Sequence, residues 1–192
     1  MSFTNIFTSF LYDKKLNLNI DKIKNHIIQT HKKDKVGFTI SNYGGWRSKT
    51  FVKTNPTVVP LFKELNEMVN KIKKQLKYKY NLKLINYWYN INSLGSSNSP
   101  HTHIGVGALL SGVFYVNTVK DGGRIVFMNS DNSNPVLYDN KIETYNEYNS
   151  STWFVKPENN LAVIFPANLL HYVQPNLNKK EKRVSISFNY GL

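Results

Sequence analysis

The order of apolar and polar residues divides the chain into a helical first part and a strand-rich second part. Four isoleucines recur at helical spacing between residues 17 and 33, where Asn19 or Asp21 is a suitable N-cap. A second amphipathic stretch runs from about Val58 to Leu76, with Pro60 in its first turn. Its opposite face is rich in lysine, which is typical of a solvated surface. We therefore expect two helices that buttress a sheet from outside.

The chain after about Leu84 has the pattern of many short strands. Runs of β-branched and aromatic residues alternate with turn clusters such as DGG, DNSNP and PENN, and no helical stretch interrupts them. The strands are expected at residues 84–91, 108–117, 123–129, 151–156, 160–165, 170–175 and 183–190. This pattern favours a sandwich or a barrel-like jelly roll. The predicted fold class is mainly β with N-terminal helices (α+β).

The length of 192 residues fits one domain. We expect residues 1–192 to form it, with a helical buttress at 1–80 and a jelly-roll core at 81–192. No internal repeat or linker interrupts the sequence. The polar segment 130–151 is expected to be a long connection that forms a rim or lid of an active site.

Composition excludes several classes of protein. A hydrophobic content of 41% is sufficient for a core and too high for a disordered chain. The absence of cysteine excludes a disulfide scaffold, a cysteine-ligated metal and a cysteine nucleophile. No signal peptide and no membrane span of about 18 apolar residues is visible, so we expect a cytoplasmic protein without a membrane partner.

The charge is strongly basic, at +13. Such a charge is typical of proteins that bind polyanions. Only three of the 25 basic residues are arginine, however, and Lys, Asn, Ile and Tyr are abundant together. The excess is therefore interpreted mainly as compositional drift, with attraction of an anionic partner as the alternative.

The five histidines are the first candidates for chemistry. His26 and His31 lie on the first expected helix and are interpreted as surface residues. His101 and His103 follow a strand, and residues two apart on an extended segment share a face, so both imidazoles can point at one ion. His171 lies 70 residues after His101, at the start of another expected strand. Two close ligands and one distant ligand on a neighbouring strand indicate a metal site.

The last expected strand carries a candidate anion site. Arg183, two serines and Asn189 alternate with apolar residues, so they occupy one face. A buried arginine requires an anion, and a guanidinium with the Ser185 hydroxyl beside it suits a carboxylate. Tyr115, on the strand at 108–117, is a further candidate for the same carboxylate. The alternative is an ordinary surface strand with Arg183 as one more exposed cation.

The ordered set of motifs resembles the 2-oxoglutarate/Fe(II)-dependent oxygenases. The H-x-H is followed by SGVFYVN, DGGRIVF, NLAVIFPANLLHYVQPN and KRVSISFN. SNYGGWRS at residues 41–48 is similar to the upstream segment of small oxygenases of this type from bacteria and marine phages, so the resemblance covers most of the chain. It implies a double-stranded β-helix, which agrees with the jelly roll expected from the strand pattern.

The resemblance also implies roles for site residues. His101 and His171 correspond to iron ligands, while Arg183, helped by Ser185 and Tyr115, would hold the distal carboxylate of 2-oxoglutarate. Most of the family has a carboxylate where this chain has His103. Either His103 is the third iron ligand, which we prefer because imidazole suits Fe(II), or it lies outside the ligand shell and leaves the position to water or an anion.

The implied function is that of a dioxygenase that uses Fe(II), 2-oxoglutarate and O2, with ascorbate as a supporting reductant. It would hydroxylate a small molecule, a protein side chain or a nucleic acid, releasing succinate and CO2. One alternative is a non-enzymatic basic jelly-roll module that binds nucleic acid or a protein, and another is a cupin-like three-histidine dioxygenase or isomerase. The aromatic residues 87–89 are expected in the core, with the substrate side as the alternative.

Overall fold

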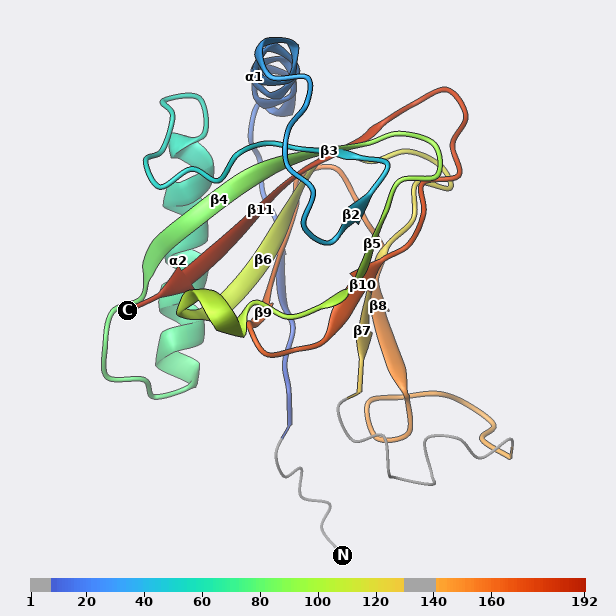
Figure 1. The fold of residues 1–192 in the computed structure, drawn as a ribbon. Coiled ribbons are helices and arrows are strands. Elements are labelled where there is room, and N and C mark those ends of the chain that lie inside the picture. The colour runs from blue at the N-terminus through green and yellow to red at the C-terminus, as the bar shows by residue number, and fades with distance from the viewer. Residues whose placement is uncertain (1–7, 130–140) are drawn as a thin grey trace, which may run out of the picture.

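Two antiparallel sheets form the centre of the computed structural model, which describes residues 8–129 and 141–192 (Figure 1). The larger sheet has the order β1–β9–β6–β11–β4–β3, with strands Tyr12–Lys15 (β1), Leu161–Pro166 (β9), Ala108–Asn117 (β6), Arg183–Gly191 (β11), Lys83–Asn92 (β4) and Trp46–Arg47 (β3). The smaller sheet has the order β2–β5–β10–β7–β8, with strands Asn42–Tyr43 (β2), Ser97–His101 (β5), His171–Val173 (β10), Ile125–Met128 (β7) and Thr152–Val155 (β8). From β4 onward the chain passes repeatedly between the two sheets, with the 3-10 helix η1 (Ile104–Val106) between β5 and β6. This is the expected jelly roll.

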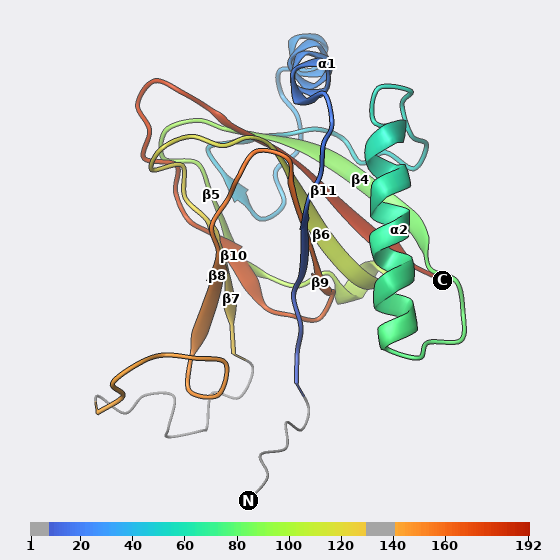
Figure 2. The same ribbon diagram turned by 180° about the vertical axis from the view of Figure 1, so that it is seen from behind.

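Two helices, α1 (Ile20–Lys33) and α2 (Val59–Gln75), pack through their apolar faces on the larger sheet. Figure 2 shows α2 lying along the outside of that sheet. The Asn19 side chain caps α1 by accepting a hydrogen bond from the backbone N–H of Lys22 at 3.0 Å, and Pro60 lies in the first turn of α2. The prediction of two buttressing helices is confirmed. No helix in the described part of the chain is long and apolar enough to cross a bilayer.

The central strands separate an apolar face from a polar face. On β11, Val184, Ile186, Phe188 and Tyr190 are buried in the core cluster shared with the helices. The alternate residues of β11 point to the opposite face, towards the smaller sheet, and line a cavity. Strand alternation therefore places the core and the candidate site on opposite faces of one sheet.

The N-terminal part of the chain also contributes strands that the sequence pattern does not predict. β1 pairs with β9, β2 pairs with β5, and β3 pairs with β4, so the first 80 residues extend both sheets as well as supporting them. β2 and β3 have only two residues each, too few for a visible alternation, and β5 has the polar sequence SNSPH. Residues 130–140 of the expected rim or lid lie outside the described residues.

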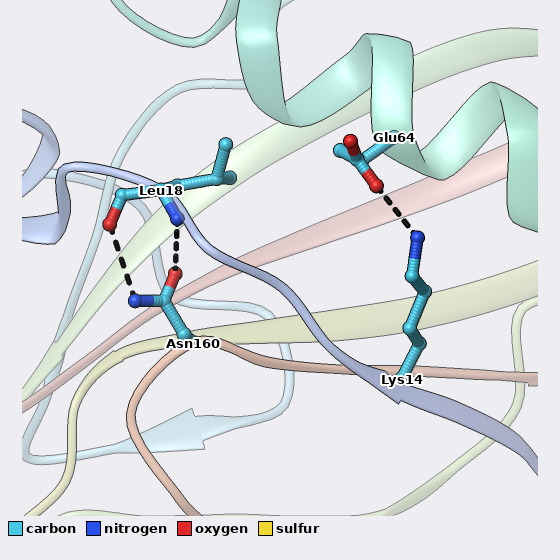
Figure 3. Close-up of polar contacts among 4 residues, drawn as sticks. All are labelled: Lys14, Leu18, Glu64 and Asn160. Atoms are coloured by element: carbon cyan, nitrogen blue, oxygen red, sulfur yellow. Dashed lines mark hydrogen bonds and ion pairs between the residues drawn. The ribbon is translucent and has the colours of Figure 1, made fainter.

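Polar contacts fix the N-terminal strand in place (Figure 3). The Asn160 side chain accepts a hydrogen bond from the backbone N–H of Leu18 and donates one to its carbonyl, both at 3.2 Å. Lys14 on β1 forms an ion pair with Glu64 on α2 at 2.8 Å. Asn160 itself has a φ of 68°, a left-handed conformation that asparagine tolerates better than most residues. The turn before β9 thereby holds the link between β1 and α1.

Candidate metal centre and anion pocket

Three histidines from different segments meet between the two sheets. His101 ends β5 and lies directly opposite His171 of β10 in the strand register, while the backbone N–H of His103 donates to the carbonyl of Ala167 at 2.8 Å. One ligand atom from each imidazole lies within 4.8 Å of the others. The structure thus brings the three predicted residues together. The expectation that His101 and His103 share a face of one extended segment is only partly correct. The strand ends at His101, and His103 lies in the connection before η1.

Backbone carbonyls fix the orientation of two of these rings. Nδ1 of His101 lies 2.7 Å from the carbonyl oxygen of Ser99, and Nδ1 of His171 lies 2.8 Å from that of Leu169. A carbonyl oxygen only accepts hydrogen bonds, so each Nδ1 must carry the proton. The lone pair is then on Nε2, the arrangement found in metal-ligating histidines with an outer carbonyl partner.

All three imidazoles are held in the neutral form that a metal needs. Burial, followed by the charges of its neighbours, lowers the pKa of His103 to about 3. Burial lowers the pKa of His171 to about 4 and also lowers that of His101. Because ligation requires deprotonated nitrogen, this cluster is ready to bind a divalent metal near neutral pH, and imidazole donors suit Fe(II).

Aromatic side chains surround the histidines. Phe165 and Phe127 lie 4.8 Å and 6.0 Å from the ring of His171, measured between centroids, and Trp88 lies 5.7 Å from the ring of His103. Trp88 is buried but lines the cavity, which was the alternative for residues 87–89, and it does not belong to the core cluster under the helices. The core expectation is confirmed for Tyr87 and Tyr89, whose side chains point towards the helices.

The two helix histidines take part in packing, contrary to the expectation of plain surface residues. Nε2 of His26 lies 3.1 Å from the hydroxyl of Tyr89, and the two rings meet edge to face. The ring of His31 packs on Trp46 at 4.8 Å. Both lie away from the three clustered histidines, because α1 covers the outer face of the sheet.

The three histidines line a cavity of about 360 Å³, and the buried guanidinium group of Arg183 lines it too. Arg183 is only 3% exposed, and its Nη1 donates to the carbonyls of Gly122 and Gln174. The ion pairs in the described part of the chain are Lys14–Glu64 and Lys15–Glu158, so no carboxylate pairs with this guanidinium. A buried arginine without a counter-ion favours the binding of an anionic ligand, to which its N–H groups can donate. The surface-strand alternative for Arg183 is wrong.

Ser185 and Tyr115 lie opposite each other on β11 and β6, and both line the same cavity. Burial raises the pKa of the Tyr115 phenol to about 12, against the opposing effect of the nearby Arg183. The phenol is therefore protonated and able to donate near neutral pH. The three residues predicted as a carboxylate clamp occupy neighbouring positions of one polar wall.

The structure adds a second buried cation that the sequence analysis did not assign to the site. Arg47 on β3 lies opposite Asn90 of β4, is 8% exposed and lines the cavity. Its guanidinium carbon lies 4.6 Å from the ring centroid of Trp88. Burial lowers its pKa to about 10, so it remains charged at neutral pH. The segment SNYGGWRS contains it, but its distance in sequence from the histidines gives no sign of this proximity.

The described residues 141–151 of the expected rim or lid form turns without helix or strand, and none of them lines the cavity. In Figure 1 they project from the ends of β7 and β8. The cavity is instead bordered by the segments before β3 and after β5.

Comparison with known proteins agrees with this geometry. Residues 86–189, more than half of the chain, match a family model described as "Putative 2OG-Fe(II) oxygenase". The match includes all three clustered histidines, Tyr115, Arg183 and Ser185. A search of curated proteins found no match.

Solved structures with this fold include a Pseudomonas putida prolyl-4-hydroxylase, with a TM-score of 0.65, 13% identity and coverage of 96% of this chain and 93% of the other. A viral collagen prolyl hydroxylase from Paramecium bursaria Chlorella virus-1, in complex with 2-oxoglutarate, has a TM-score of 0.64 and 13% identity, with coverage of 95% of this chain and 96% of the other. SnoK, a carbocyclase from nogalamycin biosynthesis, has a TM-score of 0.67 and 10% identity, with coverage of 94% of this chain and 78% of the other. At such identities these likenesses show the fold. The family model identifies the chain as a member of the 2OG-Fe(II) oxygenase family.

Proposed function

We propose that the protein is an Fe(II)- and 2-oxoglutarate-dependent hydroxylase that converts 2-oxoglutarate and O2 to succinate and CO2 while oxidising a substrate. One observation carries this proposal. A single cavity contains the only described three-histidine cluster and, on its wall, a buried arginine that lacks a carboxylate partner. These are the two anchors that iron and a dicarboxylic co-substrate require.

In this proposal His101, His103 and His171 hold the iron. The fixed Nδ1–H groups of His101 and His171 direct their Nε2 atoms to the ion, and the neutral state of all three rings removes competition with protons. His103 acts as a direct ligand because its ligand atom lies in the same cluster. When bound, iron and 2-oxoglutarate supply the oxidising chemistry, and ascorbate keeps the metal reduced.

Arg183, Ser185 and Tyr115 hold the distal carboxylate of 2-oxoglutarate. The guanidinium provides charge and a planar fork of N–H donors, and the two hydroxyls donate from the adjacent wall. Because Tyr115 stays protonated, it donates to the carboxylate rather than repelling it. Phe127 and Phe165 limit access of water near the histidines.

Binding of 2-oxoglutarate tests this assignment directly. Replacing Arg183 with Gln should weaken 2-oxoglutarate binding to the anaerobic Fe(II) protein by about 10- to 100-fold, because a charge-assisted pair to a buried anion is lost. The Fe(II)–2-oxoglutarate chelate absorbs visible light, so a spectral titration measures the affinity.

Arg124→Gln is the matched control. Arg124 donates from Nε to Oε1 of Gln174 and packs over Phe154 at 4.0 Å, outside the cavity lining. This variant should bind 2-oxoglutarate within about twofold of the wild type. Equal affinities of the Arg183→Gln variant and the wild type would remove the co-substrate assignment.

A further inference from the structure

The cavity has a second buried cation that the binding of iron and 2-oxoglutarate leaves unused. Arg47 is buried on β3, and no ion pair of the described residues neutralises it. Its Nη1 donates to the carbonyl of Ser48 at 3.0 Å and its Nη2 to Oγ1 of Thr50 at 3.1 Å. A guanidinium has five N–H donors, so most of its capacity remains available.

Arg47 and Arg183 mark different parts of the cavity. The centroid of the Trp88 ring lies 4.6 Å from the guanidinium carbon of Arg47 and 5.7 Å from the centroid of the His103 ring. Arg47 therefore lies on the His103 side of the three-histidine cluster. Arg183 instead lies next to Tyr115, whose pKa it influences. The two guanidinium groups therefore have different immediate neighbours within the cavity.

The charge balance of the cavity shows what is missing. Its described lining includes two arginines and three histidines but no aspartate or glutamate. Fe(II) and the 2-oxoglutarate dianion cancel each other, so both arginine charges remain. The family's usual metal-binding carboxylate, which would offset one of them, is replaced by His103. Uncompensated charge at low dielectric is costly, so the loaded site favours a further anion.

The position of the guanidinium suits an anion with two oxygens. The guanidinium carbon lies over the Trp88 ring, and the N–H groups that do not bond Ser48 and Thr50 remain for a ligand. Paired N–H donors match the oxygens of a carboxylate or a phosphate. Asparagines 86, 90 and 92 on β4 line the same cavity and add neutral donors and acceptors.

We propose that the substrate is a small polar acid whose carboxylate or phosphate group binds Arg47, on the His103 side of the iron. This inference rests on the proposed function, since it assumes that 2-oxoglutarate occupies Arg183. The cavity of about 360 Å³ is at the lower end of ligand-pocket sizes and must contain both molecules, so the substrate is small. The net charge of +13 assists its approach from solution.

Anion binding to the loaded protein tests the proposal. Anaerobic protein saturated with Fe(II) and 2-oxoglutarate is titrated calorimetrically with inorganic phosphate, with N-acetylglycine and with the neutral N-acetylglycinamide. We expect at least one anion to bind and the amide not to bind. Binding of phosphate alone indicates a phosphate ester, and binding of N-acetylglycine alone indicates a carboxylic acid.

Variants assign the binding to Arg47. Arg47→Gln should weaken the anion at least tenfold, whereas Lys71→Gln, which removes the same charge from the exposed face of α2, should change it less than twofold. Should Arg47→Gln fail to fold, Arg47→Lys decides the question. It keeps the charge but loses the fork, so at least threefold weaker binding is expected.

Three results would overturn the inference: no binding of either anion, binding of N-acetylglycinamide as tight as that of N-acetylglycine, or equal effects of the Arg47 and Lys71 variants. If Arg47→Gln does not fold, an anion affinity of Arg47→Lys equal to that of the wild type would also overturn the inference. The visible chelate band separates this failure from failure of the proposed function. Without the band, 2-oxoglutarate does not bind and the function itself fails; with the band but no Arg47-dependent anion, only the inference fails.

Discussion

At the scale of single residues, the proposed ligand His103 would change the charge of the metal centre. A carboxylate ligand would remove one charge from Fe(II), whereas three neutral imidazoles would leave the metal with its full charge. The neighbouring cations Arg47 and Arg183 are not balanced by acidic residues of the described cavity lining. The site therefore depends on its ligands for negative charge.

Iron affinity distinguishes the two positions considered for His103. If His103 is a direct ligand, the variant His103→Ala should lower the Fe(II) affinity by at least about 100-fold, as should His101→Ala. Loss of a ligand costs more affinity than loss of a residue that only hydrogen-bonds a ligand. His103→Asp restores a ligand and should bind far better than His103→Ala. Anaerobic titration against a competing chelator measures both. Wild-type affinity of His103→Ala would place His103 outside the ligand shell.

The lowered histidine pKa values predict how the metal-free protein responds to pH. An unfolded histidine titrates near pH 6.5, but burial lowers the pKa of folded His103 to about 3 and of His171 to about 4. Below about pH 6.5 the unfolded chain binds more protons than the folded one, so the free energy of unfolding falls as pH falls. Urea unfolding between about pH 4.5 and 7.5 should show this decline.

The variant His103→Gln supplies the comparison for this pH effect. It lacks one of the histidines whose pKa is lowered in the folded protein, so its free energy of unfolding should decline less steeply below about pH 6.5. Parallel pH profiles of the two metal-free proteins would contradict the neutral, buried state assigned to His103.

How well single residues can be predicted depends on local pattern. Alternation on one strand is sufficient to place Arg183 and Ser185 on the polar face of β11. Arg47 has no comparable signal, because its place in the cavity follows from the pairing of β3 with β4, more than 40 positions along the chain. Trp88 and Tyr89 are adjacent aromatic residues, and the sequence does not tell which of them faces the cavity. Only the orientation of β4 in the structure shows that Trp88 faces the cavity and Tyr89 the core.

At the scale of elements, long strands and helices are predictable and the shortest strands are not. β11, β6 and α2 extend over enough residues for their periodicity to be visible. β2 and β3 have two residues each and exist because longer strands offer free edges. Arg47 of β3 lines the cavity, so part of the site could not be located from sequence.

The turn before β9 provides a test at this scale. Asn160→Ala removes two hydrogen bonds to Leu18 and places alanine at a φ of 68°, so the protein should lose about 1–3 kcal/mol of unfolding free energy. Asn160→Gly removes the same bonds but accepts this backbone conformation, and should lose less. Equal losses in chemical unfolding would show that conformation contributes nothing at this turn.

At the scale of the whole molecule, the basic residues have different environments. Arg183 and Arg47 are buried in the cavity, while Lys63, Lys71 and Lys74 of α2 are exposed. The α2 helix lies along the outside of the larger sheet (Figure 2). Composition gives only the total of +13 and cannot separate them. Family membership supports the enzymatic interpretation over a non-enzymatic basic module. One fold can carry unlike chemistries, so the fold does not select the substrate.

Formation of succinate is the most direct test of the central claim. Purified protein with Fe(II), 2-oxoglutarate, ascorbate and air should produce succinate, slowly even without substrate, and His171→Ala should reduce production to that of free iron. His31→Gln, a change on the helix outside the cavity, should retain the wild-type rate within about twofold. Iron-bound wild-type protein that forms no succinate, or equal rates for wild type and His171→Ala, would contradict a 2-oxoglutarate-dependent oxygenase.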